Sequence, residues 1–268
     1  VLRRKGFCFG GALPCWFGED GLLLQKVLEP PDFSKIVLAT KQARRLGDYI
    51  RDDYEQVRIN TVGGMLARRV AECGDRTSVI WPARSLRQTY AELYESVLRV
   101  ARGLTAYGIA PGEHAAIWAP NAPEYLAVEF GCALAGVPVL FVNSGYRAYE
   151  LEYALRQSDT RILFLAEGNL QAGEYVDIVR EVRAHLPQLR HAVVFAEKTD
   201  DDFTAWPTFL VRGCGCGNAP VVHGGDIFSI QYTSGTTGQP KAALLSHQAY
   251  VSNSFAIAER QGLTGNDV

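Results

Sequence analysis

Short apolar segments alternate with amphipathic segments from residue 61 onward, and this alternation limits the folds that the chain can adopt. The segments at 114–119, 137–142 and 161–165 are mostly apolar and short enough to be strands buried on both faces. Parallel strands need a crossover of a dozen or more residues, which is usually a helix. The alternation therefore predicts an α/β fold with layered, parallel-rich sheets flanked by helices.

The same patterns place the other elements. Thr89 and Glu92 have the spacing of a capping box, and the helix that they open ends at Gly108. The apolar spacing after Thr61 predicts a helix that stops at Gly74. Further strands are predicted at 77–81, 191–195 and 226–232, further helices at 123–135, 149–157 and 172–185, and irregular structure at 198–225.

Composition and charge exclude several classes of protein. Hydrophobic residues make up 47% of the chain and charged residues 21%, which excludes a disordered chain or a coiled coil. The net charge of −2 lacks the basic excess of a nucleic-acid binder. Six cysteines are too few for a disulfide scaffold of this size, so we expect a cytoplasmic protein.

Two stretches could suggest a membrane or secretion. The longest apolar run, 130–142, is too short to span a bilayer and contains Gly136 and Pro138, so no membrane span is expected. Basic residues at 3–5 precede an uncharged stretch at 6–18, as in a signal peptide, but four glycines and Pro14 interrupt it. We therefore treat residues 1–56 as an amino-terminal extension of uncertain structure.

A hydroxyl- and glycine-rich loop follows the predicted strand at 226–232. Gly235 and Gly238 allow backbone N–H groups to approach anionic oxygens closely. The hydroxyls are rotatable donors that can also reach a metal ion, and Lys241 adds a compact positive charge. The loop therefore predicts a site for phosphate groups, whose candidate residues are Thr233, Ser234, Gly235, Thr236, Thr237, Gly238 and Lys241.

This loop differs from the common nucleotide P-loop, which has four residues between its glycines and Ser or Thr after its lysine. Here two residues separate Gly235 from Gly238, and Ala242 follows Lys241. The run from Tyr232 to Lys241, followed by Leu244-Leu245-Ser246-His247, resembles the phosphate-binding signature of the AMP-forming acyl-CoA synthetases, the adenylate-forming family. Weaker likenesses in the family's order occur at 89–93, 108–121 and 143–153.

The resemblance implies a fold and a reaction. Residues 57–268 would be part of an AMP-binding domain that activates a carboxylic acid, expected to be a fatty acid, with ATP, and passes it from the acyl-adenylate to coenzyme A. The loop would bind the phosphates of ATP, Lys241 would be catalytic, and Thr237 would reach Mg²⁺ through ATP. The partners are small molecules, and the oligomeric state stays open.

The chain also departs from the family pattern. Ala242 stands where the family usually has glycine, and Ser144 where it usually has proline. The family's adenine, ribose and acyl-pocket segments have no counterpart before Val268, so we expect a fragment that does not form acyl-adenylate by itself. An inactive remnant that at most binds phosphates, and an amino-acid or aryl-acid adenylating domain, remain alternatives.

Other reactive side chains favour ordinary structural roles. Cys214 and Cys216 lack nearby histidines, so a glycine-rich loop is favoured over a metal site. His247 is interpreted as a structural histidine, and Ser234 has no recognisable partners for a hydrolase. Tyr146, Tyr149 and Tyr153 are interpreted as packing residues.

Overall fold

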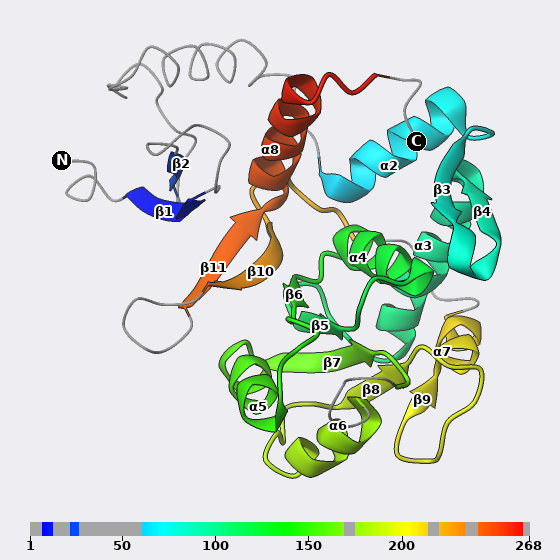
Figure 1. Cartoon of the computed structure of the whole chain (residues 1–268), viewed down its shortest axis with the longest axis vertical. Coiled ribbons are helices and arrows are strands. Elements are labelled where there is room, and N and C mark those ends of the chain that lie inside the picture. Colours follow the sequence, from blue (N-terminus) through cyan, green and yellow to red (C-terminus); the bar gives the residue numbers. More distant parts are fainter. Residues whose placement is uncertain are drawn as a thin grey trace.

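The computed structural model describes residues 7–12, 22–26, 61–168, 175–213, 220–233 and 241–264 (Figure 1). Within the amino-terminal extension it places two antiparallel strands, β1 (Phe7–Ala12) and β2 (Leu22–Lys26). The proposed division of the chain near residue 57 falls outside these ranges and stays a prediction.

A mixed sheet of seven strands forms the centre of the described residues. Its order is β11-β10-β6-β5-β7-β8-β9, and all neighbours are parallel except β10 and β11. A separate antiparallel hairpin pairs β3 (Thr77–Trp81) with β4 (Leu86–Thr89). The strands of the main sheet are β5 (His114–Trp118), β6 (Val139–Phe141), β7 (Thr160–Leu165), β8 (His191–Val194), β9 (Thr204–Ala205), β10 (Ile227–Thr233) and β11 (Lys241–Ser246).

Helices cover both faces of this sheet, as Figure 1 shows for α4 on one side and α5 and α6 on the other. Ala115 and Ile117 of β5 belong to the core beneath α3, α4 and α7, whereas Ala116 and Trp118 belong to the core beneath α5 and α6. The helices are α2 (Val62–Cys73), α3 (Tyr90–Ala106), α4 (Pro123–Ala135), α5 (Ala148–Gln157), α6 (Tyr175–Arg183), α7 (Trp206–Arg212) and α8 (His247–Arg260). The predicted fold class is confirmed.

The local signals act as expected. The Thr89 hydroxyl accepts from the N–H of Glu92 at 3.2 Å, and the Glu92 carboxylate accepts from the N–H of Thr89 at 2.8 Å, which completes the capping box. Gly108 follows α3 with a φ of 69°, a left-handed conformation that favours glycine. Helix α2 is followed by Gly74 at its carboxyl end.

The expectation of irregular structure at 198–225 is wrong. This stretch contains β9 and α7. Helix α7 has seven residues, too few for a clear helical period. It is held by Phe209, which is fully buried and whose ring centroid lies 5.2 Å from those of Tyr107 and Phe164. Burial against distant residues stabilises this helix.

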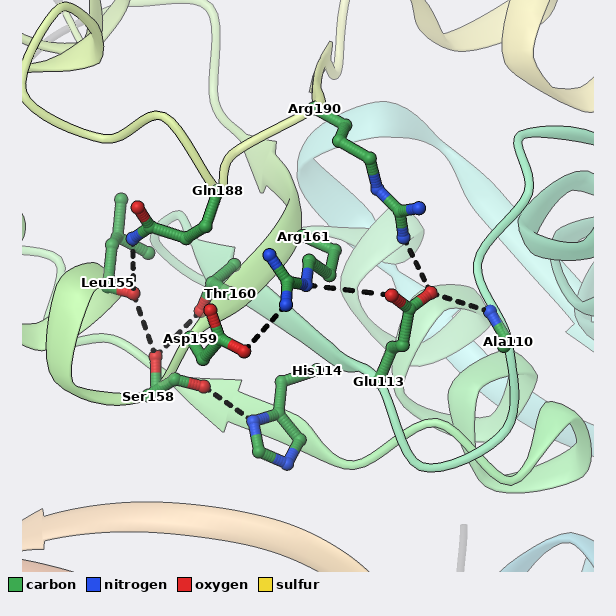
Figure 2. A network of polar contacts seen from close by, with 10 residues as sticks. All are labelled: Ala110, Glu113, His114, Leu155, Ser158, Asp159, Thr160, Arg161, Gln188 and Arg190. Atoms are coloured by element: carbon green, nitrogen blue, oxygen red, sulfur yellow. Dashed lines mark hydrogen bonds and ion pairs between the residues drawn. The ribbon is translucent and has the colours of Figure 1, made fainter.

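A network of ion pairs joins the amino ends of three parallel strands (Figure 2). Glu113, just before β5, accepts from Arg190 at 2.5 Å and from the N–H of Ala110 at 2.8 Å, and Arg161 lies 3.5 Å from its other oxygen. Burial raises the pKa of Glu113, but the Ala110 N–H and Arg190 outweigh it and lower the pKa below its usual range. The network lies at the edge of the sheet opposite to the carboxyl ends of the strands.

Candidate functional site

The two ends of the predicted phosphate loop are brought together by strand pairing. Thr233 ends β10, Lys241 begins β11, and the two residues are partners in the antiparallel register. The Thr233 hydroxyl donates to the carbonyl oxygen of Lys241 at 3.4 Å, and both residues are exposed. Ser234, Gly235, Thr236, Thr237 and Gly238 lie outside the described residues, so their roles stay predictions.

The position of β10 fixes where this loop emerges. Strand β10 pairs in parallel with β6, and Phe228, Ser229 and Ile230 are buried. The loop therefore leaves from the carboxyl end of a parallel strand, the edge at which open α/β sheets bind ligands. Ala242 pairs with Tyr232 and is exposed, so the structure accommodates its methyl group where the family usually has glycine.

The ends of β5 and β6 lie at the same edge of the sheet. The Trp118 indole N–H donates to the carbonyl oxygen of Asn143 at 3.1 Å. The Asn143 side chain accepts from the N–H of Gly145 at 2.9 Å, and the Tyr175 hydroxyl donates to the carbonyl oxygen of Ser144 at 3.2 Å. These contacts define the turn after β6, which lies in the 143–153 segment that resembles the adenylate-forming family.

Tyrosines pack beneath the end of β10. The ring centroids of Tyr232 and Tyr153 lie 6.3 Å apart, and Tyr146 packs against the same core. Burial, with smaller contributions from Tyr153 and Tyr146, raises the pKa of Tyr232 to about 12, so this hydroxyl stays protonated. Tyr146 and Tyr153 are packing residues as predicted, but Tyr149 is 77% exposed and its predicted packing role is wrong.

His247 is a structural histidine, as predicted. Its side chain is buried, and its Nδ1 accepts from the N–H of Val62 at 3.3 Å. Because Nδ1 is an acceptor, the proton of the neutral ring lies on Nε2. Burial, opposed by the charge of Asp226, lowers the pKa of His247 to about 4. The residue joins the first turns of α8 and α2.

A half-buried carboxyl group between α4 and α8 was missed by the sequence analysis. The Tyr250 hydroxyl donates to Glu129 Oε1 at 3.5 Å. Burial raises the pKa of Glu129 to about 7, although the hydrogen bond from Tyr250 opposes this effect weakly. Burial, together with the carboxylate of Glu129, raises the pKa of Tyr250 to about 12. The signal in the sequence was a lone internal acid in an otherwise apolar helix.

We expect the stability advantage of the Glu129→Gln variant over the wild type to be about 2 kcal/mol larger at pH 8.5 than at pH 5.5. The folded carboxyl keeps its proton up to about pH 7, whereas the unfolded one loses it near 4.5. The free energy of unfolding of the wild type should therefore fall as pH rises through this window. Urea denaturation at the two pH values measures this, with Glu95→Gln on the exposed side of α3 as the control. A wild type that becomes more stable between pH 5.5 and 8.5, with Glu129→Gln following in parallel, would contradict it.

Metal and membrane sites find no support in the described ranges. No three His, Cys, Asp or Glu side chains there come together in a group that could hold a metal ion. Cys214 and Cys216 lie outside these ranges. None of the described helices combines the length and the apolar character that crossing a bilayer requires.

Comparison with known families identifies the fold. The model of the AMP-binding enzyme family matches residues 66–268. The chain belongs to the AMP-binding enzyme family. This match confirms the family that the 232–247 segment of the sequence indicates.

Curated and solved relatives agree with this assignment. The putative acyl-CoA synthetase YngI of Bacillus subtilis is 32% identical over 227 residues, which cover 78% of this chain and 41% of that protein. The mitochondrial medium-chain acyl-CoA ligase ACSF2 of Rattus norvegicus is 30% identical over 229 residues, 75% of this chain and 37% of that protein. Among solved structures, the apo form of MbtA from Mycobacterium smegmatis has a TM-score of 0.70 at 28% identity, covering 84% of this chain and 40% of that one. The chain thus spans about two fifths of the length of these relatives.

Proposed function

We propose that this chain carries the phosphate-binding part of an AMP-forming acid–thiol ligase that activates a fatty acid. In this reaction the carboxylate attacks the α-phosphorus of ATP, and pyrophosphate leaves as an acyl-adenylate forms. The thiol of coenzyme A then attacks the acyl carbon and releases AMP. The observation that carries the proposal is the loop between β10 and β11, with the family's signature and with its ends paired at Thr233 and Lys241.

The loop is suited to stabilise the leaving group. Negative charge builds up on pyrophosphate as the bond to the α-phosphorus breaks. We propose that the Lys241 ammonium and the loop hydroxyls stabilise that charge, while the glycines let backbone N–H groups approach the phosphates. Mg²⁺ would accompany ATP and neutralise its phosphates. Thr237 is proposed as its contact on this chain, and Thr233 at the loop's entrance is already oriented by its bond to Lys241.

The relatives' names favour a fatty acid as the substrate. One is a medium-chain acyl-CoA ligase and another a putative acyl-CoA synthetase. An aryl acid or an amino acid would use the same phosphate chemistry, so the loop does not discriminate between them. The cytoplasm stays a prediction, and the ACSF2 relatives are described as mitochondrial.

The test is ATP–pyrophosphate exchange with medium- and long-chain fatty acids, aryl acids and amino acids, followed by thioester formation with coenzyme A. It compares the 268-residue chain with the longest chain that its gene encodes. We expect fatty acids to support exchange by the longer chain, and the 268-residue chain to stay at the level of its Lys241→Ala variant. Exchange with aryl or amino acids alone would overturn the substrate class. No exchange with any acid would favour the inactive remnant.

A further inference from the structure

Three arginine side chains act on His191, the first residue of β8. Arg190 precedes it, Arg183 ends α6 and Arg212 ends α7. Burial lowers the pKa of His191, the hydrogen bond to Tyr107 opposes this effect, and the charges of the three arginines lower the pKa further. These residues lie at the amino ends of the parallel strands, whereas the phosphate loop leaves from a carboxyl end. They are therefore separate from the site proposed above.

Two of these arginines are held by neutral groups. Arg183 donates to the carbonyl oxygen of Asp202 at 2.5 Å, and the carboxylate of Asp202 faces Arg180 instead. The guanidinium group of Arg212 lies 4.7 Å from the ring centroid of Tyr107. A carbonyl group or an aromatic ring orients a guanidinium group without cancelling its charge. Both arginines therefore keep their positive charge in a fixed position.

The third arginine belongs to the network at the amino ends of the strands. Figure 2 shows that Arg190 shares the carboxylate of Glu113 with Arg161, which also pairs with Asp159 at 2.7 Å. Together with the arginines that end α6 and α7, this group contains four guanidinium groups and two carboxylates. Two positive charges are left over, and a bound anion would reduce the repulsion between them.

His191 adds a donor that a ligand can reach. Its Nε2 lies 3.0 Å from the carbonyl oxygen of Tyr107, so Nε2 carries a proton and donates. Its Nδ1 has no hydrogen-bond partner among the described residues, and it gains a proton when the ring becomes charged. Arg190 and Arg212 are exposed, and His191 is half-buried, so this group of donors is open to solvent.

We propose that Arg183, Arg190, Arg212 and His191 form a binding site for a doubly charged phosphate group, such as the group that a phosphate monoester carries. The planar guanidinium group matches the oxygens of phosphate, and two charges on the ligand balance the two in excess. The inference goes beyond the ligase activity and does not depend on it.

The first test needs no variant. The 268-residue chain is titrated with sodium sulfate, a dianion, while sodium chloride keeps the ionic strength constant, and NMR follows the ring of His191. We expect sulfate to saturate and to raise the pKa of His191 by about one pH unit, because an anion beside the imidazole favours its charged form. A pKa that sulfate changes no more than chloride does would overturn the proposal. The arginines would then serve only to offset the partial negative charge at the ends of α6 and α7.

A second test locates the anion. Arg212→Gln should weaken sulfate binding about tenfold, because it removes a charged hydrogen-bond donor from an exposed position. Arg68→Gln, at an exposed arginine of α2, is the matched control and should leave the affinity unchanged. Circular dichroism checks that both variants are folded. Equal sulfate affinity in Arg212→Gln and Arg68→Gln would show an adventitious ion only and would overturn the site.

A third test distinguishes the two sources of such a phosphate group. Glycerol phosphate presents it in solution, and phosphatidylcholine vesicles that contain phosphatidic acid present it as a lipid headgroup. Competition of glycerol phosphate with sulfate would support a soluble ligand. Flotation with the phosphatidic acid vesicles, lost in Arg212→Gln and absent with pure phosphatidylcholine, would support a headgroup. Failure of both would overturn the ligand class.

Discussion

Replacing Lys241 with alanine should slow acyl-adenylate formation about 10²–10³-fold in the longest chain that the gene encodes. One preorganised donor to a developing negative charge typically contributes about 3–4 kcal/mol to transition-state stabilisation. Lys241 is exposed at the start of β11, directly opposite Thr233, so its charge can be removed without disturbing a core. Single-turnover rates of adenylation, measured apart from thioester formation, test the prediction.

The pattern of kinetic constants distinguishes the proposed role from simple ATP binding. If Lys241 acts mainly on the transition state, kcat should fall by a larger factor than KM for ATP rises. Gly238→Val should also weaken ATP binding, because a side chain there would block the approach of the backbone to phosphate. Lys198→Ala, which removes another exposed lysine, is the matched control. An unchanged adenylation rate in Lys241→Ala would leave the ligase assignment to family membership alone.

Replacing Gly131 with valine should lower the free energy of unfolding by more than 3 kcal/mol. Gly131 lies in α4 where it crosses α3, and a Cβ atom there would come within 2.5 Å of Val100 Cγ1 and 3.2 Å of the Val97 carbonyl oxygen. Val97 and Val100 are fully buried, so neither can move away freely. Overpacking of this kind typically costs about 1–3 kcal/mol, and a side chain as large as valine adds to it.

Urea denaturation measures this loss. Gly225→Val is the control, because a Cβ atom at Gly225 would meet nothing within 4 Å. Gly131→Ala should fall between the wild type and Gly131→Val, since the gain in helix propensity offsets part of the clash. A Gly131→Val variant as stable as Gly225→Val would show that α3 and α4 do not cross at this residue.

The sequence alone determined the features that depend on neighbours along the chain. The capping box at Thr89, the left-handed stop at Gly108 and the apolar strands each follow from a local period or a local hydrogen bond. The phosphate-loop signature was equally local, because it is a fixed run of residues between two strands. These signals were sufficient to predict the α/β class and the family.

Only the tertiary structure decided what depends on residues far apart in the sequence. Helix α7 exists because Phe209 is buried against Tyr107 and Phe164, and His247 is structural because it bonds Val62, 185 residues away. The raised pKa of Glu129 arises in the same way, from surroundings assembled by several helices. Burial and hydrogen-bond satisfaction are properties of the packed chain, and a residue's sequence neighbours do not specify them.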